Sequence, residues 1–467
     1  MSSFSTGLYG STISSIVNNV NDAFSGKTSG IDVGTVVGEL MQVERQPEVQ
    51  LQNQQTTINS QVSALNGISS QLTALYTSVN NLKDIFGAFS QNATGSSDSA
   101  IVSATADRTA TAGTHSVTVS KLAMTSSSYS GYISSGTSLG GTQLVVKYGS
   151  DPANPLKTDT INIPSADTTL QQAASYINSG SYGATASVLT DSQGSRLVLV
   201  SRTSGANGSL NVSSPAASFT TSAGVDAQLN VDGVPVDSAT NTVTSAIPGV
   251  TLSLGAADAN TSVLISVQPD TTTASQSVQD FVDAYNAVIG SINSQYTLDS
   301  SGNEGVLAGD SMLRTLQSSL LSMVTGSVQG VGQYVNLQSM GIEMQNDGTL
   351  QINSANLSQA LSSNFSDVQS FFQSTSGWGQ VAGKQMLQLT DPTLGPVAAD
   401  TNGLKQTSQG LTDQINDFEL RMASVQDQLT TQYSNLDALL QQYPMQLQQV
   451  AAQLGSLPSS SSTSTSS

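Results

Sequence analysis

The chain has 467 residues and a net charge of −19, with 13 Lys and Arg against 32 Asp and Glu. No basic cluster offers the positive charge that a phosphate backbone requires, so we expect no nucleic acid among its partners. There is no cysteine and a single histidine, His115, which excludes disulfides and leaves little for triad or metal chemistry. No apolar run approaches the roughly 18–20 residues that span a bilayer, so membrane insertion is not expected. We therefore expect a protein that is not an enzyme and carries no metal or cofactor.

The first 46 residues form an N-terminal segment without a strong folding signal. Residues 1–30 are rich in Ser, Gly, Asn and Thr, and a short helical pattern then runs from Ile31 to Pro47. Proline lacks an amide hydrogen and clashes with the preceding turn, so the helix should kink or restart at Pro47. Because short isolated helices are marginal in water, we expect residues 1–46 to be mobile until the protein assembles.

An uninterrupted apolar heptad follows Pro47. Its positions are Leu51, Ile58, Leu65, Leu72, Val79 and Phe86, with a second apolar row at Ile68, Leu75 and Leu82. This pattern predicts a helix roughly 54 Å long that packs its apolar stripe, here called the N-terminal seam, on a partner helix. Only Lys83 and Asp84 carry charge between Leu51 and Phe86, so the outer face is free for further helices.

A matching C-terminal seam has its heptad positions at Ile415, Met422, Leu429, Leu436 and Tyr443. The two seams predict an antiparallel coiled-coil stalk made from residues 47–99 and 401–457. Because the seams have nearly equal length, Pro47 and Pro444 should lie at the same end, far from the head, with a short outer tier beyond each. A pair of ordinary core helices is the alternative. Residues 458–467 are expected to be a disordered Ser/Thr tail.

Between the seams the apolar periodicity changes from helical to strand-like and back. Alternating residues predict a β head domain in 100–129 and 221–270, with a tight hairpin at Asp232-Gly233. Residues 130–220 hold a second set of strands and one helix (168–178, capped by Asp167 or Thr168), which predicts an inserted β-rich head domain. Residues 271–400 predict a helical body with a β-hairpin. The expected fold class is therefore α+β multidomain, with a long stalk from both termini, a helical body and inserted β-rich heads.

Three isolated features are candidates for chemical sites. His115 lies in a strand-like stretch, where a lone histidine is more often an exposed polar position than a catalytic base. Asp299, Asn303 and Glu304 faintly resemble a calcium loop but lack the EF-hand spacing, which favours a solvated turn. Trp378 between two glycines could anchor an interface, although a satellite hydrophobic contact is favoured. The two seams are thus the candidate functional residues, acting as coiled-coil and assembly interfaces.

Several segments resemble one family, the bacterial flagellar filament cap proteins, also called hook-associated protein 2. The segments are SGIDVGTVVGELMQVERQP, ATADRTATAGTHSVTVSKLAMTSS, LNVDGVPVDSATNTVTSAIPGVTLSL, FVDAYN, GVLAGDSMLRTL and LQSMGIEMQNDGTLQI. In the head, TLQQAASYINS and RLVLVSRTSGANGSL resemble a module shared with other hook-associated proteins and flagellins. The resemblance covers nearly the whole chain, but about thirty residues precede the first segment, more than we expect for the family.

The resemblance implies a secreted, extracellular protein at the distal tip of the flagellar filament. Its expected partners are further copies of itself in a closed ring, with about five or six subunits as first guesses, flagellin, and a flagellar export chaperone before secretion. The ring would prevent leakage of exported flagellin and promote its folding and polymerisation. Two other classes stay open: a filament or hook-junction structural subunit, and an adhesin that binds host glycans through the head.

Overall fold

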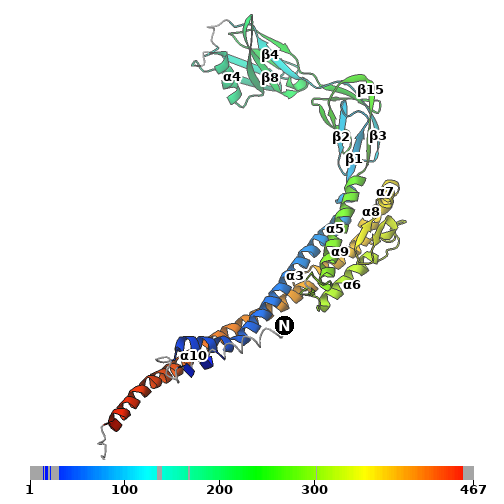
Figure 1. The fold of residues 1–467 in the computed structure, drawn as a ribbon. Coiled ribbons are helices and arrows are strands. Elements are labelled where there is room, and N and C mark those ends of the chain that lie inside the picture. Colours follow the sequence, from blue (N-terminus) through cyan, green and yellow to red (C-terminus); the bar gives the residue numbers. More distant parts are fainter. Residues whose placement is uncertain are drawn as a thin grey trace, which may run out of the picture.

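The computed structural model describes residues 14, 16–18, 21–22, 31–133, 139–166, 169–300 and 302–455. The molecule is elongated: a long helical leg joins a helical body, and two β domains follow one another beyond the body (Figure 1). This arrangement confirms the predicted α+β class with a helical stalk, body and β-rich heads. The Ser/Thr tail expected at 458–467 lies outside the described residues. Within the described part of the chain, every helix is too short or too polar to cross a membrane.

Three helices form the leg: α2 (Val33–Glu44), α3 (Gln46–Lys83) and α10 (Pro396–Gly455). The Asp32 carboxylate caps α2 by accepting the Thr35 amide at 3.2 Å. Pro47 occupies the first turn of α3, where a missing amide hydrogen costs no helical bond, so the predicted restart is confirmed. By contrast, α10 continues through Pro444, so the separate outer tier expected beyond that proline is wrong.

The register between α3 and α10 is fixed by polar contacts along the antiparallel pair. Gln55 Nε2 donates to Thr412 Oγ1 at 2.6 Å, and Ser408 Oγ donates to Asn59 Oδ1 at 2.8 Å. In both pairs the facing residue numbers sum to 467. Pro47 therefore lies opposite residue 420 or so, and Pro444 lies about 24 residues, or roughly 36 Å, further from the head. The expectation that both prolines share one level is wrong.

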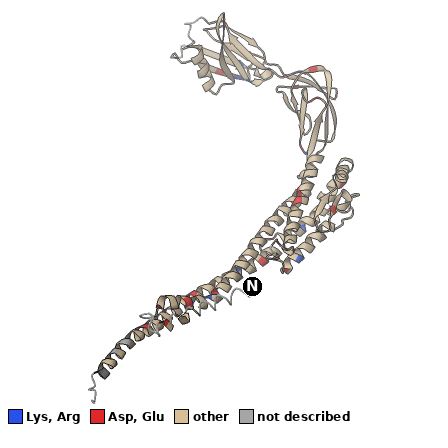
Figure 2. Cartoon of the chain, viewed as in Figure 1, with Lys and Arg blue, Asp and Glu red and all other residues tan. Residues whose placement is uncertain are grey.

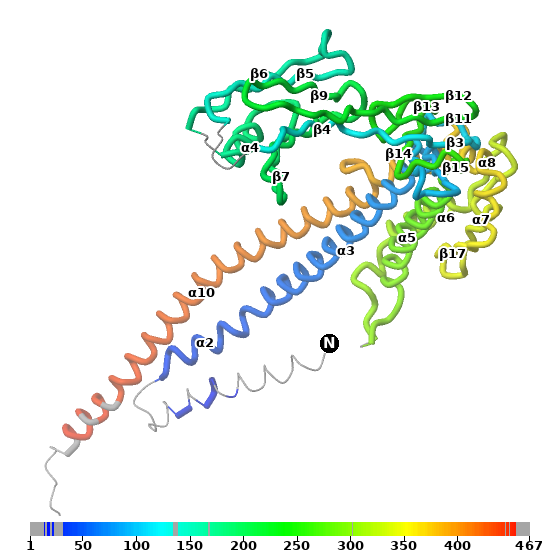
Figure 3. The backbone as a smooth tube through the Cα atoms, turned by 90° about the horizontal axis from the view of Figure 1, so that it is seen from above, coloured from blue at the N-terminus to red at the C-terminus, as the bar shows by residue number. Residues whose placement is uncertain are grey.

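The two seams are offset because α3 divides its apolar face between two partners. Its lower part lies against α10, whereas Leu65 and the apolar residues after it are buried in the core of the body with α5 (Thr271–Tyr296). Figure 3 shows α10 on one side of α3 and α5 on the other. In turn, the middle of α10 packs on α2, where Val37 and Met41 form a small apolar cluster with Phe418 and Met422.

The body is helical with one small hairpin. Its elements after α5 are α6 (Ser311–Thr325), β16 (Ile342–Met344), β17 (Leu350–Ile352), α7 (Ser354–Ser363), α8 (Phe365–Gln373) and α9 (Trp378–Leu389). Trp378 is only 2% exposed and donates its indole N–H to the Met323 carbonyl at 2.9 Å. Its ring stacks on Phe371 and meets Phe281 edge-on. The satellite contact expected for Trp378 is therefore wrong, because this side chain lies at the centre of the body core.

The first head domain consists of two antiparallel sheets with an apolar core between them. Its strands are β1 (Asn92–Ser96), β2 (Val102–Ala106), β3 (Gly113–Lys121), β11 (Ala227–Val231), β12 (Val234–Ser238), β13 (Thr242–Ile247), β14 (Val250–Leu254) and β15 (Asp258–Pro269). One sheet has the order β1-β15-β3-β11-β12 and the other β13-β14-β2. Since β1 pairs with β15, the stalk range 47–99 extends too far, and the helix ends at Lys83.

The second head domain has its own apolar core, formed by residues between Ile133 and Leu210. Its elements are β4 (Thr125–Ser130), β5 (Gln143–Tyr148), β6 (Lys157–Asn162), α4 (Leu170–Ser179), β7 (Ala184–Asp191), β8 (Gly194–Ser204), β9 (Leu210–Ser213) and β10 (Phe219–Ser222). Thr169 caps α4 in a capping box with Gln172, so neither cap expected from the sequence is correct. Asp167 and Thr168 lie outside the described residues.

Two glycines of α9 give a matched test of the contact between this helix and its neighbours. A Cβ on Gly379 would overlap the backbone carbonyl oxygen of Phe372, whereas a Cβ on Gly383 would meet only the flexible end of Lys83. We predict that Gly379→Ala lowers the free energy of unfolding by about 1–3 kcal/mol. Gly383→Ala should be neutral or stabilising by up to about 1 kcal/mol, since alanine favours the helix. Urea denaturation of both variants checks this, and equal losses would contradict it.

Candidate assembly interface

The N-terminal seam is buried inside the subunit along most of its length. Leu65, Leu72 and Val79 are at most 1% exposed, and all three belong to the body core. Leu51 and Ile58 are half-buried on the stretch of α3 that lies against α10. These residues therefore hold the leg to the body and leave little apolar surface on α3 for other subunits.

Phe86 does not continue the seam, because α3 ends before it. The Asp84 backbone is extended at the end of α3, and its carboxylate accepts the Phe86 amide at 2.9 Å. The ring of Phe86 is 60% exposed, with the guanidinium carbon of Arg108 4.9 Å from its centroid. The placement of Phe86 in the helical seam is wrong, since a heptad continues in sequence beyond the point where the cap turns the chain.

The C-terminal seam changes from buried to exposed along α10. Met422 is 4% exposed in the cluster with α2, Ile415, Leu429 and Leu436 are half-buried, and Tyr443 is 63% exposed. The apolar residues around Tyr443, several of them in the outer tier expected beyond Pro444, complete an exposed surface. We call this surface the distal stripe; it consists of Leu439, Tyr443, Met445, Leu447 and Val450, each more than half exposed. Residues 438–455, which carry the stripe, contain no charged side chain.

The remainder of the leg is acidic, as Figure 2 shows. Near the junction of α2 and α3 the Glu48 carboxylate is buried and accepts the Arg45 guanidinium at 2.9 Å and the Gln52 amide at 3.0 Å. Arg45 also lies 3.9 Å from Glu419 of α10. The pair with Arg45 satisfies the buried charge of Glu48, and the longer contact with Glu419 is an exposed one between this junction and α10.

The leg leaves the body beside a pair of carboxyl groups. Asp310 caps α6 by accepting the Met312 amide at 2.7 Å, and Asp400 approaches it from the first turns of α10. Burial, together with the hydrogen bond and the charge of Asp310, raises the pKa of Asp400 to about 6. A proton on Asp400 therefore relieves the repulsion between the two carboxyl groups.

We predict that this pair makes the protein more stable in mild acid. A folded-state pKa above the ordinary value of 3.8 means that stability is greatest while Asp400 is protonated and falls as pH rises through about 6. Asp400→Asn should remove this dependence and raise stability above pH 7 by about 1 kcal/mol, allowing for solvent screening. Denaturation between pH 5 and pH 8 measures it, with Asp413→Asn as the exposed control on the same helix. A variant with the parent's pH dependence would contradict the assignment.

The other candidate sites in the sequence, His115 and the turn at Asp299, have structural roles. His115 Nδ1 lies 2.7 Å from Asp232 Oδ2, and Asp232 Oδ1 accepts the Ser116 amide at 2.8 Å. These two hydrogen bonds lower the pKa of Asp232 and hold a turn in which this aspartate has a φ of 52°. Asp299 and Asn303 bond to each other within a turn, as expected. Across the described ranges, His, Cys, Asp and Glu side chains form no group of three that could hold a metal.

The small apolar cluster between α2 and α10 predicts unequal protection along the leg. Two buried side chains of α2 are joined to α10 by this cluster, whereas the upper part of α3 lies in the large core of the body. In isolated subunits we expect amide hydrogens of 33–44 to exchange at least about tenfold faster than those of 65–82. Hydrogen-exchange mass spectrometry checks this, and equal protection of both stretches would contradict the expected mobility of residues 33–44.

The fold and its exposed surfaces define a class of protein. The two ends of the chain supply an elongated leg, β domains are inserted between them, and the apolar surface at the free end of the leg is suited to helix packing. This is the architecture of an assembly scaffold. The chain belongs to the flagellar hook-associated protein 2 family: the model of the family's N-terminus matches residues 29–126 and that of its C-terminus matches 224–444.

Curated relatives and a solved structure agree with this assignment. The chain is 28% identical to the B-type flagellar hook-associated protein 2 of Pseudomonas aeruginosa, over 88% of this chain and 92% of the relative. It is 27% identical to flagellar hook-associated protein 2 of Escherichia coli K12, over 89% of this chain and 94% of the relative. The D1-D2-D3 domains of the flagellar cap protein FliD from Escherichia coli align with a TM-score of 0.57 and 26% identity, covering 73% of this chain and 99% of that structure.

Proposed function

We propose that this protein caps the bacterial flagellar filament. It forms an oligomer at the distal, extracellular tip, retains exported flagellin there and promotes its folding and polymerisation. The observation that carries this function is the family match over 29–126 and 224–444, together with the similarity to the solved structure of a flagellar cap protein. A filament subunit or an adhesin is not favoured by these similarities.

The mechanism follows from the division between leg, body and head. The heads form a plate that covers the channel, and the legs reach toward the growing end of the filament. The distal stripe packs against helices of neighbouring subunits, either other copies of the cap or flagellin. Because apolar helix packing forms and breaks without covalent chemistry, each contact is reversible as a new flagellin enters. The ring holds about five or six copies, and an export chaperone covers the stripe before secretion.

Deletion of the gene tests the function directly. Cells without the protein should release flagellin monomers into the medium while hooks are still present, and expression of the intact chain should restore filaments. Electron microscopy and immunoblots of the medium provide the two measurements. Filaments of normal length on the deletion strain would refute capping.

The buried seam predicts a large effect of charge in the core of the body. Leu72 is 1% exposed, and burying an unpaired carboxylate there costs several kcal/mol. Leu72→Asp should therefore abolish motility rescue in the deletion strain. His115→Ala should retain it, because that side chain holds only an exposed turn of the head. Equal rescue by both variants would show that the seam does not hold the leg to the body.

The distal stripe predicts loss of assembly without loss of folding. Leu447 is 65% exposed, so Leu447→Asp should leave the melting temperature of the subunit unchanged within about 2 °C. The same change places a carboxylate in the proposed apolar contact and should lower the mass of the oligomer and release flagellin into the medium. Leu420→Asp is the matched control, since Leu420 is 73% exposed on the same helix but outside the stripe. Normal capping by Leu447→Asp would exclude the stripe as a contact surface.

A further inference from the structure

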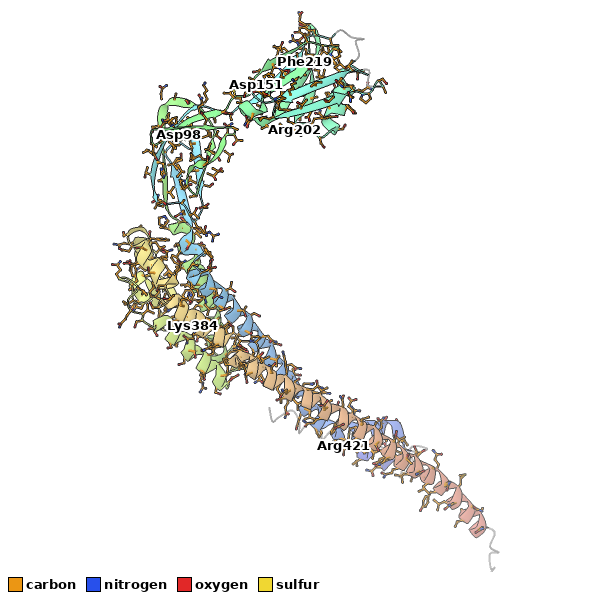
Figure 4. All side chains as sticks on the ribbon, turned by 180° about the vertical axis from the view of Figure 1, so that it is seen from behind. Asp98, Asp151, Arg202, Phe219, Lys384 and Arg421 are labelled. Atoms are coloured by element: carbon orange, nitrogen blue, oxygen red, sulfur yellow. The ribbon has the colours of Figure 1, made fainter. Side chains whose placement is uncertain are left out.

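The two head domains are joined by two short chain segments that pair with each other. Met124, in the outgoing segment, donates its amide to the Val225 carbonyl at 2.8 Å, and the Val225 amide donates back to Met124 at 3.1 Å. Figure 4 shows the resulting connection between the first head domain, marked by Asp98, and the second, marked by Arg202 and Phe219. A two-stranded connection by itself can twist and bend, as hinges between domains do.

A loop of the second head domain is seated on this connection. Residues 205–209 lie between β8 and β9, and groups of this loop and of the adjoining Ser204 form hydrogen bonds outside the second head domain. The Gly205 amide donates to the Met124 carbonyl at 3.1 Å, and the Ala206 amide donates to Asp226 Oδ1 at 2.7 Å. Ser204 Oγ donates to the Ala239 carbonyl of the first head domain at 2.6 Å. The loop therefore contacts both the connecting segments and the far domain.

Side chains from each domain also hold the connecting segments. Asn241 of the first head domain accepts the Ala123 amide at 2.7 Å and donates to the Ala123 carbonyl at 3.1 Å, which pairs it with one segment as a strand would be paired. Ser209 of the second domain accepts the Gly224 amide of the other segment at 3.1 Å. Each connecting segment is thus hydrogen-bonded to the other segment and also to a side chain of one head domain.

The fit at the centre of this contact leaves no room for a side chain. Gly205 has a φ of +82°, and a Cβ added to it would overlap a carboxylate oxygen of Asp226 and lie 2.8 Å from the Cα of Ala239. A Cβ on Gly224 would in turn overlap the Gly205 carbonyl oxygen. Glycine is the residue that allows both the left-handed backbone and the close approach.

We propose that these groups form an interdomain clasp, which holds the two head domains as one rigid unit in the free subunit. Ser204, Gly205, Ala206, Asp226 and Asn241 make up the clasp, and Gly205 is the point at which it closes. The orientation of the second domain is therefore set by the fold itself, before any contact with neighbouring subunits.

The absence of cysteine from the chain makes a spin-label experiment direct. Leu189→Cys places a label on the second head domain and Leu264→Cys one on the first, at side chains that are 58% and 52% exposed. We expect a single narrow distance distribution by pulsed electron paramagnetic resonance. Gly205→Ala should broaden it by about twofold or more, because the clasp can no longer close. Gly233→Ala is the matched control: its φ of +86° imposes the same strain, but nothing lies within 4 Å of the added Cβ.

Two further measurements keep the outcome decisive. A label pair within the second domain, Leu156→Cys with Leu189→Cys, reports whether that domain stays folded in each variant. If Gly205→Ala fails to fold, the combined Ser204→Ala and Asn241→Ala variant removes clasp hydrogen bonds without backbone strain and should show the same broadening. A broad distribution in the parent protein, or a narrow one in every folded clasp variant, would overturn the proposal.

Discussion

The division of one apolar stripe between two partners determines the shape of this molecule. From Leu65 to Leu82 the stripe of α3 completes the body core, and below that level it meets α10. Because α3 continues from one environment into the other as a single helix, the body cannot shift along the leg without exposing apolar surface. The heads gain a fixed base in the same way, since Phe89, just after α3, stacks on Phe372 in the body core. Continuous packing thus fixes the positions of the leg, the body and the heads relative to one another.

Sequence periodicity predicted the existence of the leg but not its register. Heptads at Leu51–Val79 and Ile415–Tyr443 are long and regular, which is where periodicity is most reliable. The register of the two helices depends on specific side-chain contacts, which the apolar periodicity does not encode. Here those contacts are polar, such as Gln55 with Thr412 and Ser408 with Asn59. Because the two apolar stripes have equal length, the sequence predicted that α3 and α10 pair along their whole seams. In the structure, the part of the α3 stripe nearest the heads packs in the body core instead.

In the heads, the sequence did not predict β4 as a strand, because its inward-facing residues are polar. β4 reads TSSSYS, and its inward residues Ser126, Ser128 and Ser130 are fully buried. Each hydroxyl is bonded to a neighbouring strand or turn: Ser126, for example, accepts the Leu210 amide at 2.9 Å and donates to the Ser222 carbonyl at 2.7 Å. A buried serine is inexpensive only when such partners exist, and they become visible only once the strands are placed side by side. The distal stripe likewise becomes visible only in the folded structure, since its exposure depends on where α2 ends its contact with α10.

The absence of charge at the end of α10 determines how strongly the surrounding medium can affect a contact made there. The distal tip of a flagellar filament is exposed to the medium around the cell. Ion pairs between exposed groups weaken as salt rises, because the Debye length shortens from about 30 Å at 0.01 M to about 3 Å at 1 M. A contact made through residues 438–455 contains no ion pair to be screened, and only Tyr443 among these residues can titrate. The proposed contact through the distal stripe should therefore depend little on the salt concentration and acidity outside the cell.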